Sequence, residues 1–216
     1  MKRLFILFVL MFMFVPDVNA LECDTSTQCA LLGKQLLNQK EYKNAIECFD
    51  RAISFDEKDF FAHAYRAKAY YYLGNYGNAK KDIEKSLEIK PNSVAYGLKS
   101  SLYLKEGKYR ETIESSTKAI ELNPDYMKCY EVRGRAKVGL EDYFGALKDA
   151  TKAVKLRNNY AKSYEVMGMA HIGLRDYPSA VADYEKAAEL FKEQGDRKNY
   201  KKMKKIMKLC RKRIEK

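Results

Sequence analysis

The stretch GRAKVGLEDYFGALKDATKA, residues 134–153, is a clear copy of a pattern that runs through most of the 216-residue chain. It places a small residue nine positions before a tyrosine and two more small residues three and ten positions after it. The pattern recurs around five tyrosines separated by 34, 33, 34 and 34 residues, namely Tyr42, Tyr76, Tyr109, Tyr143 and Tyr177. A period this regular indicates one supersecondary unit copied five times, which favours a protein that binds other proteins.

Small residues hold the same three places in every copy. The place before the tyrosine is taken by Gly33, Ala67, Ser100, Gly134 and Gly168. The first place after it is taken by Ala45, Ala79, Thr112, Ala146 and Ala180, and the second by Ala52, Ser86, Ala119, Ala153 and Ala187. Small side chains at these places let two helices approach closely, with the tyrosine packed near the turn between them.

This arrangement resembles the tetratricopeptide repeat, a helix-turn-helix unit of about 34 residues, from roughly residue 26 to residue 194. The family's large residue early in the first helix is matched by Tyr96, Tyr130 and Tyr164, and its proline late in the second by Pro91 and Pro124. The resemblance implies an all-α fold, a right-handed α-solenoid of about five helix-turn-helix repeats plus a C-terminal capping helix. The repeats are expected at residues 26–59, 60–92, 93–126, 127–160 and 161–194.

The first twenty residues have the organisation of a secretory signal peptide. Lys2 and Arg3 precede twelve apolar residues, 4–15, and small residues end at Ala20. Twelve apolar residues are too few to span a bilayer, which takes about 20. We expect cleavage after Ala20 and a secreted or periplasmic chain that starts at Leu21, with an uncleaved membrane anchor as the alternative. The absence of an N-glycosylation sequon favours a bacterial envelope or the extracellular space.

The formal net charge of +12 is concentrated at the C-terminus. Residues 197–216 contain eleven Lys or Arg and one acid, whereas residues 21–196, the expected solenoid, are almost balanced. Within this basic segment an apolar stripe recurs at helical spacing, formed by Tyr200, Met203, Met207, Cys210 and Ile214. The stripe predicts an amphipathic helix that covers the last repeat. The alternative is a helix that docks on an anionic surface, such as lipid or a cell-wall polymer, and nucleic acid is the weakest variant.

The sequence offers little for catalysis. His63 and His171 lie at inward helix positions without partners at ligand spacing, so they are interpreted as packed side chains rather than metal ligands. No phosphate-binding glycine loop or nucleophile motif is present, and we expect neither enzyme activity nor a cofactor.

The cysteines suggest a covalent link near the N-terminus. Cys23 and Cys29 bracket the start of the first helix and are predicted to form a disulfide, with Cys29–Cys48 as the competing pair. Cys129 and Cys210 are interpreted as small buried hydrophobic residues.

The resemblance implies that a peptide or protein segment binds along the concave face, which the first helix of each repeat lines. By the family's register the candidate partner-binding residues are Phe61, Lys68, Tyr71, Tyr72, Lys128, Arg135 and Lys162. The same register places Lys34, Lys105, Glu131 and Glu165 on this face, also as exposed residues. Tyr71 and Tyr72 could instead pack between neighbouring repeats. The sequence thus predicts an exported, non-enzymatic scaffold or adaptor, with binding to an anionic surface through the C-terminal helix as the alternative.

Overall fold

The computed structural model describes residues 23–215, so the expected signal peptide lies outside the described residues. Within this range the chain forms eleven α-helices and no strand. The helices are α1 (Ser26–Asn38), α2 (Tyr42–Phe55), α3 (Phe60–Tyr72), α4 (Tyr76–Ile89), α5 (Ser93–Lys105), α6 (Tyr109–Leu122), α7 (Met127–Gly139), α8 (Tyr143–Leu156), α9 (Ala161–Gly173), α10 (Tyr177–Glu193) and α11 (Arg197–Ile214).

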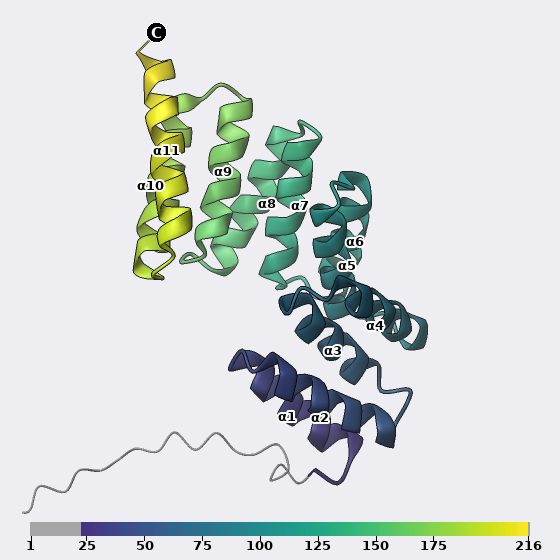
Figure 1. The fold of residues 1–216 in the computed structure, drawn as a ribbon. Coiled ribbons are helices and arrows are strands. Elements are labelled where there is room, and N and C mark those ends of the chain that lie inside the picture. Colours follow the sequence, from purple (N-terminus) through teal and green to yellow (C-terminus); the bar gives the residue numbers. More distant parts are fainter. Residues whose placement is uncertain (1–22, 216) are drawn as a thin grey trace, which may run out of the picture.

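The helices stack as antiparallel pairs in chain order, from α1 and α2 at one end to α9, α10 and α11 at the other (Figure 1). The stack changes direction between the pair α3–α4 and the pair α5–α6, which gives the molecule a curved outline (Figure 1). The expected all-α solenoid is therefore confirmed.

The repeated small residues lie where the two helices of each pair meet. The alanines, serines and threonine at these places have no exposed surface, among them Ala67, Ala146 and Ser100. A Cβ atom added to Gly33 would lie 2.8 Å from the Phe49 ring, closer than packed atoms allow. The repeated small residues thus mark positions where a larger side chain would force the paired helices apart.

The repeated tyrosines connect one repeat to the next. A Cβ atom added to Gly139 in α7 would lie 2.6 Å from the ring of Tyr109, which starts α6 in the preceding repeat. Tyr42 stacks on Tyr72 of the following repeat with the ring centroids 5.2 Å apart. Each of these rings therefore fills the gap that opens between successive helix pairs.

The turn after each first helix has a residue in the left-handed conformation, with φ between 62° and 78°. In two repeats this residue is glycine, at Gly74 and Gly107, which adopts such a φ without steric cost. In the other three it is Lys40, Glu141 or Arg175, so these turns retain backbone strain.

Buried ion pairs join the two helices of the second and fourth repeats. Arg66 on α3 donates two hydrogen bonds to Asp82 on α4, at 2.8 and 2.7 Å, and Arg133 on α7 does the same to Asp149 on α8, at 2.9 and 2.7 Å. Burial alone would raise the pKa of Asp82, but the hydrogen bonds from Arg66 and His63 outweigh it and lower that pKa. His63 is buried in this network, 3.3 Å from Asp82.

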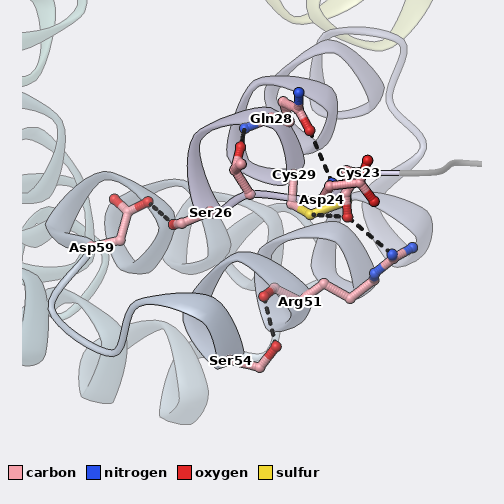
Figure 2. Close-up of a disulfide and its surroundings, with 9 residues drawn as sticks. Cys23, Asp24, Ser26, Gln28, Cys29, Arg51, Ser54 and Asp59 are labelled. Atoms are coloured by element: carbon pink, nitrogen blue, oxygen red, sulfur yellow. Dashed lines mark hydrogen bonds between the residues drawn. A yellow bond between two sulfur atoms is a disulfide. The ribbon is translucent and has the colours of Figure 1, made fainter.

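A disulfide between Cys23 and Cys29, whose Cα atoms are 5.2 Å apart, fixes the start of the described chain to the first repeat (Figure 2). The Cys23 carbonyl accepts a hydrogen bond from Arg51 on α2 at 3.2 Å, and Ser26 donates one to Asp59 at 2.7 Å (Figure 2). Cys48, the competing partner, is a buried free thiol. These bonds tie the segment before α1 to α2, and the first residue of α1 to the start of α3.

The C-terminal helix α11 packs on α10 in a position beyond the fifth repeat (Figure 1). Met203, Met207 and Cys210 are buried in a cluster that includes Tyr184 and Phe191 of α10. Ile214 was expected to belong to this stripe, but half of its surface is exposed. That expectation was wrong because the apolar contact ends at Cys210, one turn before the helix does.

Candidate functional site

The first helices of the repeats form the inner face of the curve. Contacts link α1 with α3, α3 with α5, α5 with α7 and α7 with α9, whereas successive second helices contact each other less. Closer spacing on one side of a stack makes that side concave. All seven candidate partner-binding residues lie on first helices of this face, and they fall into two adjoining groups.

The first group is an aromatic patch on α3, made of Phe61, Tyr65, Tyr71 and Tyr72. Phe61 and Tyr65 lie with their centroids 4.2 Å apart. Tyr71 contacts Tyr72 edge-on at 5.8 Å, and about half of the Tyr72 surface is exposed.

Lysines border this aromatic patch. The ammonium of Lys34 lies 5.5 Å from the Phe61 ring, and that of Lys68 lies 5.6 Å from the Tyr65 ring. Phe61 is half-buried against the core of the first repeat. Lys34, Lys68, Tyr71, Lys128, Arg135 and Lys162 are half-buried as well, so among the cations and aromatic residues expected to be exposed only Tyr72 and Lys105 are fully so. Tyr72 combines both roles considered for it, because it packs on Tyr42 and still presents free surface.

The second group lines a pocket of about 210 Å³ between α3, α5, α7 and α9. Its charged lining residues are Lys105, Lys128, Glu131, Arg135 and Lys162, and Tyr71 of the aromatic patch forms part of its wall. We call these five charged residues the basic pocket. The structure thus brings Lys128, Arg135 and Lys162 together and joins them to Tyr71, while Lys68 lies apart beside Tyr65.

One buried carboxylate organises the cations of the basic pocket. The Glu131 side chain has no exposed surface and receives hydrogen bonds from Lys128 at 2.5 Å and from Arg135 at 3.4 Å. Lys128 also lies 3.4 Å from the Tyr160 hydroxyl. Among residues 23–215, neither Lys105 nor Lys162 has a carboxylate within ion-pair distance, so the pocket keeps an excess of positive charge.

Burial lowers the pKa of Lys162, and the nearby charge of Lys128 lowers it further. Burial followed by the charge of Lys34 has the same effect on the pKa of Lys68. Each of these two ammonium groups is thus partly desolvated and lies near a second lysine. An anion beside it would stabilise its charged form.

Glu131 and Glu165 were expected among the exposed residues of the concave face, and this expectation was wrong. Both are buried, and both are paired with cations, Glu131 with Lys128 and Arg135, and Glu165 with Lys202 of α11 at 2.7 Å. The C-terminal helix thus supplies the partner of Glu165.

Sequence reasoning missed two tyrosines at the edge of the groove, Tyr126 and Tyr160. They occupy the N-cap positions of α7 and α9 and make no side-chain cap hydrogen bond, whereas Asp59 and Asn92 cap α3 and α5 at the equivalent positions. Comparing the residue before each first helix would have revealed the change from capping residues to tyrosine.

Other kinds of site find no support in the described part of the chain. Residues 23–215 contain no group of three or more His, Cys, Asp or Glu side chains placed to hold a metal ion. No helix formed by these residues has the length and apolar character needed to cross a bilayer.

Comparison with family models identifies the repeats. Models described as tetratricopeptide repeat match residues 29–59, 60–93, 94–126 and 161–194, which together make up more than half of the chain. The fourth helix pair, α7 and α8, lies between two of these matched segments.

Individual proteins show the same likeness. The mitochondrial import receptor subunit TOM70 of Saccharomyces cerevisiae is 36% identical over 94 residues, which cover 43% of this chain and only 15% of that protein. The solved structure of TTC0263, a thermophilic tetratricopeptide protein of Thermus thermophilus, superposes with a TM-score of 0.66 at 21% identity, over 82% of this chain and 98% of that one. YrrB, described as having an unusual peptide-binding site, gives a TM-score of 0.61 at 18% identity, over 83% and 92% of the two chains.

Proposed function

Because the chain belongs to the tetratricopeptide repeat family, we propose that it is an exported, non-enzymatic scaffold that binds a segment of another protein in its concave groove. The observation that carries the proposal is the continuity of exposed Tyr72, Tyr71 and the basic pocket along one face. An aromatic surface beside two lysines without a carboxylate partner among residues 23–215, Lys105 and Lys162, provides both apolar contact area and recognition of polar groups, as protein-binding sites do.

Export rests on the leader-like residues 1–20 and on the Cys23–Cys29 disulfide. Disulfides persist in oxidising compartments, which include the periplasm and the extracellular space. N-terminal sequencing of protein made in a secreting host should begin at Leu21, and peptide mapping without reductant should find Cys23 joined to Cys29. An intact Met1 in the membrane fraction would make residues 1–20 an anchor instead.

Site-specific photocrosslinking tests the groove. A photoreactive phenylalanine analogue at Tyr72 should capture a partner in the native envelope. The same analogue at Phe144, on the second helix α8 and 76% exposed, is the matched control and should not. Equal capture at both positions, or capture only at Phe144, would move the binding site off the concave face.

A second candidate function is attraction to an anionic surface through α11. The helix is amphipathic, and its lysines other than Lys202 extend into solvent without a carboxylate partner among the described residues. Replacing Lys201, Lys204, Lys205, Lys208 and Lys212 with Gln should then abolish binding to anionic vesicles at low salt and leave groove crosslinking unchanged. Vesicle binding that persists in this variant would exclude the helix as the docking element.

A further inference from the structure

The charges of the solenoid are distributed unequally between its faces. The concave face has six cations and two carboxylates, and the carboxylates are both buried. The cations are Lys34, Lys68, Lys105, Lys128, Arg135 and Lys162. Residues 21–196 as a whole contain nearly equal numbers of acids and bases, so the rest of this segment has a slight excess of acids. The groove is thus the positive part of the solenoid, and α11 is a separate basic region.

The positive charge of the groove is only partly compensated from within. Glu131 forms ion pairs with Lys128 and Arg135, and Glu165 forms an ion pair with Lys202 of α11. Lys162 lines the basic pocket, half-buried, without an ion-pair partner among the described residues, and the Lys105 ammonium lies over the Tyr76 ring, at 4.8 Å. Lys162 is partly desolvated and lies near the charge of Lys128, so a bound anion would stabilise its ammonium.

The aromatic patch and the basic pocket are adjacent, and Tyr71 belongs to both. Its ring contacts Tyr72 at 5.8 Å on one side, and it lines the pocket that contains Lys162 on the other. One short ligand segment can therefore contact the exposed Tyr72 ring with an apolar side chain and reach the pocket with the next few residues.

From this arrangement we infer that the groove recognises an acidic peptide segment, with an aromatic or aliphatic side chain on Tyr72 and carboxylates of neighbouring residues in the basic pocket. The inference rests on the proposed function and specifies the chemistry of the partner. Lys162 and Lys105 bind the carboxylates, while Glu131 holds Lys128 and Arg135 in place.

Selection of displayed random peptides on residues 21–216 tests this inference. The selected peptides should be enriched in Asp and Glu and contain an aromatic or aliphatic residue beside them. A fluorescein-labelled synthetic copy of the strongest peptide should lose about tenfold or more in affinity for the Lys162→Glu variant. The matched control is Lys152→Glu, an exposed lysine on the second helix α8, which should change affinity by less than about twofold.

Lys162 is a better test position than Lys128, because replacing Lys128 would also remove an ion-pair partner of the buried Glu131 carboxylate. The α11 variant with five lysines replaced by Gln is a second control, since a basic helix attracts acidic peptides without a groove. Loss of binding in that variant with no effect of Lys162→Glu would place the acidic ligand on α11 and overturn the inference.

A third variant, Tyr72→Ala, separates this inference from the proposed function. Peptides that lack acidic enrichment and depend on Tyr72 but not on Lys162 would refute the acidic ligand and keep the groove. Failure to select any peptide that depends on either residue would count against the groove itself, and the inference would fall with it.

Discussion

The substitution Met203→Ala tests whether α11 stabilises the solenoid as a cap. Met203 has no exposed surface and belongs to the cluster with Tyr184 and Phe191 of α10. Truncating a buried methionine to alanine costs about 2–5 kcal/mol, since transfer free energy is lost and a cavity remains. For a chain of this length each kcal/mol lowers the melting temperature by about 2–4 °C. Even the smallest expected effect is therefore a fall of about 4 °C.

The location of Met203 also predicts which helices Met203→Ala destabilises most. In a stacked repeat protein each unit contacts only its neighbours, so loss of the cap should open α10 and α11 before the N-terminal repeats. Urea titration followed by circular dichroism gives the free energy of unfolding, and amide hydrogen exchange locates the change. Exchange should accelerate in α10 far more than in α3.

The control is Lys204→Ala, an exposed residue on the same helix, which should stay within about 0.5 kcal/mol of wild type. Met203→Ala with an equally small effect, or with exchange accelerated evenly along the chain, would show that α11 does not act as a cap. Deletion of residues 197–216 should exceed the effect of Met203→Ala and uncover Phe191, so soluble protein with unchanged melting would refute the same reasoning.

Three further changes test the interior and the turns. Arg133→Met removes two hydrogen bonds to the buried Asp149 carboxylate, which keeps Lys137 at 2.9 Å as a partner, and should cost about 1.5–3 kcal/mol in a denaturation titration. Asp82 has a lowered pKa, so its stabilising contribution is present above the unfolded value of about 3.9 and is lost as pH falls towards the folded value; Asp82→Asn should flatten the acid-unfolding curve in that range. Glu141→Gly relieves left-handed strain of about 1–2 kcal/mol against an entropy cost of about 0.5–1, so its melting temperature should rise slightly.

The parts of the fold that sequence predicted are those set by excluded volume. At Gly33 or Gly168 a Cβ atom would lie within 3 Å of an aromatic ring of the paired helix, so only the smallest residue fits. Such restrictions act on single positions and recur with the repeat, which makes them visible as a period. The helix pairs and their boundaries follow from that period.

One part of the candidate site was less predictable because its state depends on a partner far away in sequence. Register placed Glu131 and Glu165 on the concave face, but both are buried and paired with cations. For Glu165 that cation is Lys202, 37 residues later and outside the repeats. This pairing is not part of the repeat pattern. The register of the repeat therefore places Glu165 correctly on the concave face but gives the wrong exposure for its side chain.

The N-cap positions of α7 and α9 show that the groove side of these repeats departs from the best local choice. A capping side chain stabilises a helix by about 0.5–2 kcal/mol relative to a residue that cannot cap. Asp59 and Asn92 make this bond in two earlier repeats, whereas Tyr126 and Tyr160 do not. Positions where the sequence lacks the residue that best stabilises the local helix are expected at functional or strained sites. In α9 the Tyr160 hydroxyl instead accepts a hydrogen bond from Lys128 of the basic pocket, at 3.4 Å.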